Sequence, residues 1–206
     1  MAQLQRWMID APQAQEKIRF PGSADRDLFV EIGCGKGDFL IARALAHPEY
    51  DYIGIEGQET VLLRALEKAQ QIEDGEGKIL SDHLRFSCLF VRSMQDLFDD
   101  GSLAGIYLNF SDPWPKARHA KRRLTYRERL KEYVRALKPG GSIEFKTDND
   151  PLFEFTLEEI AACGLAPAEM SRDLHSTDLP ARLVMTEYEK KFRSAGKAIN
   201  YVKVIV

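Results

Sequence analysis

A single carboxylate, Asp112, lies in a turn whose residue types suit the handling of a nucleobase. Residues 109–116 read Asn-Phe-Ser-Asp-Pro-Trp-Pro-Lys, so Trp114 stands between two prolines. Proline fixes φ and cannot continue a central strand, so the apolar strand before this segment must end here. A rigidly placed carboxylate beside an aromatic ring can hold and stack a base next to a reaction centre. A turn in which Trp114 is a buried anchor is an equally consistent interpretation.

A dense basic run follows the turn. Residues 116–129 hold seven Lys and Arg against one acid, a local charge of +6 in a chain of net charge −3, which leaves −9 on the remainder. A basic segment on an acidic body indicates a local contact with a polyanion and argues against coating of a duplex. A solvated run of like charges is the alternative.

The composition is typical of one soluble globular domain, with 206 residues of which 44% are apolar and 30% charged. No apolar run approaches the roughly 18 residues of a membrane span, and residues 1–10 lack a signal-peptide pattern. Cys34, Cys88 and Cys163 are widely spaced and form no C-x-x-C motif. We therefore expect a cytoplasmic protein with reduced thiols, no disulfide, no metal site and no membrane contact.

Short apolar runs alternate with helical patterns, which predicts β-α-β units around a parallel sheet. We expect seven strands, near residues 28–32, 52–56, 84–89, 104–110, 142–147, 166–171 and 198–205. We expect six helices, near residues 4–18, 37–46, 58–71, 125–137, 151–163 and 180–194. The predicted fold is α/β and doubly wound, with helices on both faces of a mostly parallel sheet. No repeat or linker divides the chain, so we expect one domain over 1–206, with 1–26 as a helical extension.

Two helix starts carry recognisable capping patterns. Thr125 and Glu128 have the spacing of a capping box, in which each side chain accepts a hydrogen bond from the backbone amide of the other residue. Asp150 and Pro151 suit the N-cap and the first helical position, and Gly164 suits the end of that helix.

A glycine-rich turn follows the first predicted strand. Gly33, Gly35 and Gly37 alternate with other residues, and Glu31 precedes the first glycine by two positions. A dinucleotide fingerprint needs G-x-G-x-x-G, which is not present, whereas E-x-G-x-G-x-G is the form carried by class I S-adenosylmethionine methyltransferases. Glu56 ends the second strand, where nucleotide-binding doubly wound folds hold a ribose diol. A plain tight turn and a strand-end acid that starts the next helix are the alternatives.

Four acids are predicted at one edge of the sheet. Glu31, Glu56, Asp112 and Asp148 each lie at or just past the carboxyl end of a predicted parallel strand. In an open α/β sheet those ends face the ligand crevice, so we expect the four side chains around one site. The third strand breaks the series, because residues 90–93 contain no acid.

Three motifs together resemble the bacterial tRNA (guanine-N7)-methyltransferases. They are the segment 111–124 (SDPWPKARHAKRRL), the segment 146–149 (KTDN) and the segment 186–192 (TEYEKKF). The resemblance covers roughly residues 27–206. It implies a Rossmann-like methyltransferase domain whose seventh strand is antiparallel, and transfer of a methyl group from S-adenosylmethionine to guanine 46 in the variable loop of tRNA.

The resemblance also implies roles for individual residues. Glu31, Gly33, Gly35, Gly37 and Glu56 are expected to bind the cofactor, together with Asp112, which resembles the active-site acid. The expected substrate-binding residues are Lys116, Asp148, Thr186 and Glu189, and the expected RNA contacts are His119, Lys121, Arg122 and Arg123. Thr186 and Glu189 also have capping-box spacing, which is a purely structural alternative. The family usually carries Asp or Asn after the third strand, near the adenine. That position here falls among residues 90–92, so no side chain is expected to bind the adenine, and we expect backbone amides to do so instead.

Guanine N7 has an in-plane lone pair and no proton, so its methylation needs no general base. The chemistry is then dominated by positioning and by a carboxylate, Asp112 or Asp148, that stabilises the purine as it becomes cationic. The expected partner is tRNA, and the protein is expected as a monomer or homodimer. The alternatives are a class I methyltransferase for another nucleobase and a non-catalytic RNA-binding module of the same fold.

Overall fold

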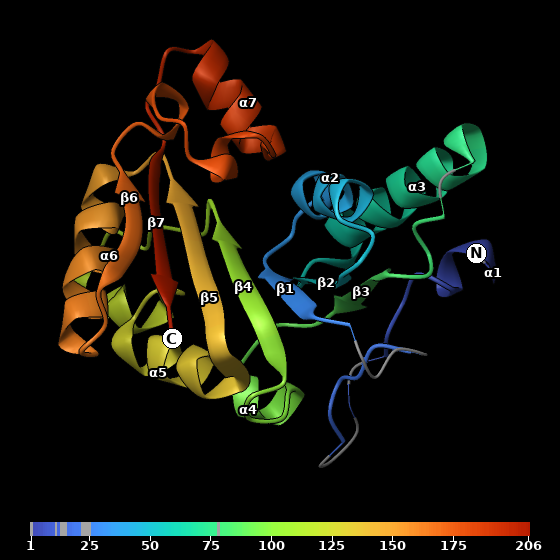
Figure 1. The fold of residues 1–206 in the computed structure, drawn as a ribbon, viewed down its shortest axis with the longest axis horizontal. Coiled ribbons are helices and arrows are strands. Elements are labelled where there is room, and N and C mark those ends of the chain that lie inside the picture. Colours follow the sequence, from blue (N-terminus) through green and yellow to red (C-terminus); the bar gives the residue numbers. More distant parts are fainter. Residues whose placement is uncertain (1, 11, 13–15, 22–25, 78) are drawn as a thin grey trace.

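The computed structural model describes residues 2–10, 12, 16–21, 26–77 and 79–206. Seven strands form one sheet in the order β3-β2-β1-β4-β5-β7-β6 (Figure 1). β7 is antiparallel to both of its neighbours, so the other six strands are parallel to one another, and the expected Rossmann-like α/β fold is confirmed. The strands are β1 (Leu28–Ile32), β2 (Asp51–Glu56), β3 (Leu84–Cys88), β4 (Leu103–Asn109), β5 (Leu137–Thr147), β6 (Pro167–Ser171) and β7 (Asn200–Ile205).

Helices cover both faces of this sheet, as predicted. The helices are α1 (Ala2–Gln5), α2 (Asp38–Ala46), α3 (Glu59–Glu76), α4 (Met94–Leu97), α5 (Arg127–Ala136), α6 (Asp150–Ala162) and α7 (Glu187–Ser194), with short 3₁₀ turns at Ala117–Arg122, Leu174–Ser176 and Pro180–Arg182. One hydrophobic cluster joins the sheet to α4, α5 and α6, and a second joins it to α2 and α3. Ile106 and Leu108 belong to the first cluster and Tyr107 to the second, because successive strand residues point to opposite faces.

The predicted helix over residues 4–18 is wrong. α1 ends at Gln5, and Met8 then pairs with Phe86 beside β3. The amide of Ile9 donates to the carbonyl of Phe86 at 2.8 Å, and the amide of Phe86 donates to the carbonyl of Trp7 at 2.7 Å. This extended segment satisfies backbone groups that the edge strand would otherwise leave unpaired. Residues 11 and 13–15 of the predicted helix lie outside the described residues.

Two of the predicted helix starts also differ. α5 has no side-chain cap of its own: the Thr125 hydroxyl lies 2.8 Å from that of Thr156, and Glu159 of α6 accepts from the backbone amide of Arg127 at 2.7 Å. A tertiary contact therefore replaces the predicted capping box. At α6 the N-cap is Asn149, one residue before the predicted one.

The last predicted helix, 180–194, is divided into the 3₁₀ turn Pro180–Arg182 and α7. α7 lies at the end of the sheet towards which β4 and β5 point (Figure 1). Because the carboxyl ends of the parallel strands meet there, α7 lies over the edge where the sequence predicts a ligand site.

Candidate active site

A cavity of about 150 Å³ lies at the carboxyl ends of β1 and β4. One wall is the glycine-rich turn between β1 and α2, and the opposite wall is the start of α7, with Thr186, Glu187 and Tyr188. Glu31 and Asn109 line it from the sheet. The doubly wound topology has therefore placed a pocket where such folds bind their ligands.

The glycine turn needs its glycines for two different reasons. Gly33 and Gly35 have φ values of 77° and 56°, and a Cβ added at either would meet no atom within 4 Å. The backbone of this turn is thus open to close approach by a ligand. Gly37, with φ of 75°, is a packing position, since its Cβ would lie 2.9 Å from that of Ala65 on α3.

Glu31 has a half-satisfied carboxylate inside the protein. Its side chain is 2% exposed, and Asn109 Nδ2 donates to its Oε1 at 2.8 Å. Its Oε2 is buried with no hydrogen-bond partner among the described residues. Burial raises the pKa of Glu31 to about 8, although the Asn109 hydrogen bond acts in the opposite direction. A cationic ligand group in the cavity would satisfy this oxygen and restore the charged form, so the site fits an ammonium group.

Glu56 supports the glycine turn from the end of β2. Its Oε2 accepts from the amide of Gly35 and its Oε1 from the amide of Gln58, each at 3.0 Å. The lining of the cavity includes Gly35 but not Glu56. An ionised carboxylate has about four acceptor sites, so these two hydrogen bonds leave capacity for a hydroxyl donor. The ribose role of Glu56 stays a prediction.

The Asp112 turn is conformationally strained on both sides of the acid. Phe110 and Trp114 have φ values of 51° and 41°, which non-glycine residues rarely adopt, and such outliers cluster at functional sites. Asp112 is exposed and makes no hydrogen bond or ion pair to any described residue. Its carboxylate is therefore available to a ligand, and its catalytic role stays a prediction.

Arg123 holds this turn from inside the basic run. Its Nε donates to the carbonyl of Pro113 and its Nη2 to that of Trp114, each at 3.0 Å, while its guanidinium lies 4.2 Å from the centre of the Phe155 ring. These donors are used within the protein, whereas Lys121 and Arg122 are exposed. The sequence predicts phosphate contacts for all three cations. In the structure the side chain of Arg123 instead binds the Asp112 turn, whereas those of Lys121 and Arg122 face solvent.

The other predicted contacts surround the turn. Lys116 is exposed and His119 half-buried, with the His119 ring 5.8 Å from that of Trp114. The Arg122 guanidinium lies 4.9 Å from the Trp114 ring, so this indole packs against the basic run at the surface and not in the hydrophobic core.

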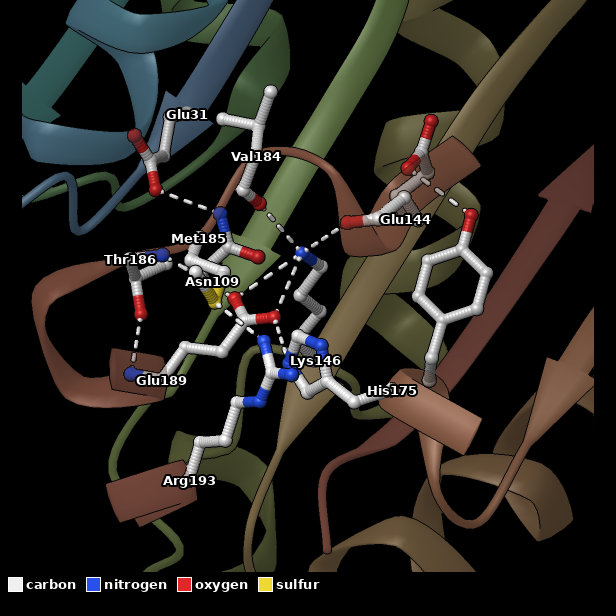
Figure 2. A network of polar contacts seen from close by, with 12 residues as sticks. Glu31, Asn109, Glu144, Lys146, His175, Val184, Met185, Thr186, Glu189 and Arg193 are labelled. Carbon is white, nitrogen blue, oxygen red and sulfur yellow. Dashed lines mark hydrogen bonds and ion pairs between the residues drawn. The ribbon is translucent and has the colours of Figure 1, made fainter. Parts of the chain in front are cut away.

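Asp148, just past β5, forms an ion pair with Lys197 at 3.1 Å. Thr186 and Glu189 form a capping box at the start of α7, as their spacing suggests. Thr186 lines the cavity, but Glu189 is fully buried and its carboxylate meets Lys146 at 3.2 Å and His175 at 2.9 Å (Figure 2). Substrate contact by either residue stays a prediction.

Sequence reasoning missed Asn109 and Lys146 as site residues. Both are buried polar side chains near the carboxyl ends of buried strands. A polar group in a buried strand requires a hydrogen-bond partner, and this requirement could have marked both residues as site candidates. After β3, where the sequence predicts the adenine, Phe90 is 73% exposed and lies against Gly57.

The sheet with antiparallel β7 between β5 and β6, the glycine turn and the buried acid are together the features of a class I methyltransferase. Residues 25–202 match a family model described as a putative methyltransferase. The chain belongs to the tRNA (guanine-N7)-methyltransferase family, because relatives of that name match most of its length. Those from Halalkalibacterium halodurans and Limosilactobacillus reuteri are each 44% identical to it, over 84% and 92% of this chain and 74% and 86% of their own. The relative from Bacillus subtilis is 41% identical over 87% of this chain and 81% of its own.

Solved structures agree in fold. An antibiotic-related methyltransferase superposes with a TM-score of 0.61 at 18% identity, covering 88% of this chain and 87% of its own. The 16S rRNA methyltransferase KamB gives a TM-score of 0.59 at 10% identity, covering 87% of each chain. No helix in the described part of the chain has the length and apolar character that a bilayer crossing demands. Nor do the described His, Cys, Asp and Glu side chains form a group of three or more that could hold a metal ion.

Proposed function

We propose that this protein transfers the methyl group of S-adenosyl-L-methionine to N7 of guanine 46 in the variable loop of tRNA. The observation that carries the proposal is that two different carboxylates lie at, or just past, the carboxyl ends of the adjacent strands β1 and β4. Glu31 is buried with a free oxygen beside the glycine turn, whereas Asp112 is exposed on a strained turn that precedes the basic run. The guanine-N7 specificity named for the curated relatives is the second support.

On the cofactor side, Glu31 binds the methionine ammonium and the backbone at Gly33 and Gly35 approaches the ligand closely. Glu56 holds the ribose hydroxyls while it keeps the turn in place through Gly35. When bound, S-adenosyl-L-methionine supplies an electrophilic methyl group on a sulfonium. The protein's own contribution there is orientation, which can account for a large share of the rate of a displacement between two held reactants.

On the substrate side, no proton has to leave N7, so the proposed role of Asp112 is electrostatic. Its carboxylate accepts hydrogen bonds from guanine N1–H and N2–H, which adenine cannot match, and offsets the positive charge that develops on the ring. Asp148 is the second candidate for this role. Lys116 and Thr186 complete the nucleotide site, and Glu189, which is fully buried, supports it through the Thr186 amide. His119, Lys121 and Arg122 contact tRNA phosphates, which fix position without reading sequence. We propose that one domain, 1–206, acts in the cytoplasm as a monomer or homodimer.

The test is transfer of label from radioactive S-adenosyl-L-methionine to a tRNA transcript, followed by nucleoside mapping. A transcript with adenine at position 46 is the matched control. We expect label only in 7-methylguanosine at position 46 and none in the control. Label in another nucleoside would make the protein a methyltransferase of different specificity, and tight binding without label would make it an RNA-binding module.

A further inference from the structure

A row of polar side chains crosses three adjacent strands beneath the cavity. Asn109 of β4 is the register partner of Lys146 of β5, and Glu31 of β1 is hydrogen-bonded to Asn109. All three are at most 8% exposed. Neighbouring residues in the same register share a face of the sheet, so this row runs from the cofactor end of the cavity towards α7.

Among the described residues, the side chain of Lys146 makes all of its hydrogen bonds to the segment 181–189, which we call the α7 entry (Figure 2). Its Nζ donates to the carbonyl of Ala181 at 2.7 Å and to that of Val184 at 3.0 Å. The Glu189 carboxylate lies 3.2 Å from the same nitrogen. An ammonium has three N–H donors, so the α7 entry uses all of them.

Glu189 connects Lys146 to the wall of the cavity through Thr186. Its Oε2 accepts from the amide of Thr186 at 3.2 Å, and the Thr186 hydroxyl accepts from the amide of Glu189 at 2.9 Å. Thr186 and the next two residues form one side of the cavity. The position of that wall therefore depends on a carboxylate that Lys146 holds.

Stability does not explain this arrangement. Burial lowers the pKa of Lys146, with Glu189 acting in the opposite direction, so the ammonium is held at an energetic cost. Replacing a buried ion pair with apolar side chains of similar volume is often neutral or stabilising. What an apolar side chain cannot do is fix two carbonyls and a carboxylate of one segment at defined positions. The arrangement is thus better suited to positioning than to stability.

We propose that Lys146 is a positioning residue for methyl transfer, which holds the α7 entry against the cofactor cavity through Ala181, Val184 and Glu189. It does not line the cavity, and it acts through Thr186 and its neighbours. This inference rests on the proposed function for its effect on turnover, but not for its effect on the α7 entry.

The experiment compares Lys146→Met, Glu189→Gln, the double variant Lys146→Met/Glu189→Gln and the parent. Lys203→Met is the matched control, because Lys203 lies on the neighbouring strand β7 and its ion-pair distances are longer, 3.8 and 3.9 Å. Amide hydrogen exchange is measured for peptides covering 181–189 and for the β1 and β4 strands. kcat and KM for tRNA, and affinity for S-adenosylhomocysteine, are measured in parallel.

We expect Lys146→Met to speed exchange in the α7 entry at least tenfold while the strands keep their protection. Turnover should fall at least tenfold, with affinity for S-adenosylhomocysteine, measured at a pH where Glu31 is ionised in both proteins, within threefold of the parent. The double variant should be no worse than Lys146→Met, because both changes remove the same link. Lys203→Met should match the parent in every measurement.

The double variant also covers a folding failure of Lys146→Met, because it leaves no unpaired buried charge. Parent-like exchange in 181–189 together with kcat within twofold of the parent, in Lys146→Met or in the double variant, would overturn the positioning role. The exchange measurement needs no activity, so a parent that fails to methylate tRNA would refute the proposed function without deciding the role of Lys146.

Discussion

Arg123 offers the sharpest test of how the basic run is used, because the structure gives it a different role from its neighbours. Its two hydrogen bonds run from a charged donor to the carbonyls of Pro113 and Trp114, and its guanidinium packs on Phe155. Hydrogen bonds to charged groups contribute about 1.5–3 kcal/mol each. A cation–π contact at an exposed site adds about 0.5–1 kcal/mol.

Arg123 is half-buried, so the lower ends of these ranges apply and solvent screens part of the effect. Together the three contacts contribute on the order of 2–4 kcal/mol to holding the turn. This must offset the strain of Phe110 and Trp114, which costs roughly 1–3 kcal/mol per residue. Without Arg123 its contacts no longer offset the backbone strain of Phe110 and Trp114, and the turn that presents Asp112 relaxes to other conformations.

We therefore expect Arg123→Ala to lower kcat by about tenfold or more, since 1.4 kcal/mol corresponds to a factor of ten. Its tRNA affinity should keep the salt dependence of the parent. Lys121→Ala is the matched control: each lost phosphate contact should flatten the log–log salt slope by about 0.7–0.9. The assay is a salt titration of tRNA binding beside initial rates at saturating tRNA. A normal kcat with a flattened slope for Arg123→Ala would refute the clamp and return Arg123 to the phosphate contacts.

Three further changes test the cofactor and substrate sides. Glu56→Ala should weaken S-adenosyl-L-methionine binding by about 1.5–3 kcal/mol and leave the fold intact, and unchanged affinity in calorimetry would remove Glu56 from the ribose role. Asp112→Asn should lower kcat far more than it weakens tRNA or cofactor binding, and near-normal turnover would reduce Asp112 to a turn-former. The free protein should bind the cofactor more tightly as pH rises through about 8, because the raised pKa of Glu31 keeps its carboxyl protonated below that value. Glu31→Gln should lose both this pH dependence and most of the affinity, and a parallel pH profile for the variant would contradict the assignment.

The parts of the structure that the sequence predicts are those governed by local pattern. The apolar runs locate the strands to within a few residues, except that β5 begins at Leu137 instead of near 142. The glycine spacing likewise predicts the turn after the first strand, in which Gly33, Gly35 and Gly37 have φ above zero. Both features depend on neighbours along the chain, so the sequence contains what determines them.

The parts it missed are governed by contacts across the chain. Arg122 and Arg123 are adjacent and chemically identical in the sequence, yet only Arg123 reaches the carbonyls of the Asp112 turn. Glu159 lies 32 residues from the Arg127 amide that it caps, so no local motif marks it. Local propensity loses to tertiary contact at such positions.

The polar row beneath the cavity also links the charge states of the two sides of the site. Lys146 favours the ionised form of Glu31, and Glu31 in turn opposes the loss of the Lys146 proton. A ligand ammonium beside Glu31 would extend this into alternating charges: ligand cation, Glu31, Lys146 and Glu189. Removal of the Lys146 charge takes away a group that lowers the pKa of Glu31, so the midpoint for cofactor binding in Lys146→Met should move to higher pH. A midpoint equal to that of the parent would show that Glu31 titrates independently of Lys146 and that Lys146 acts on the α7 entry alone.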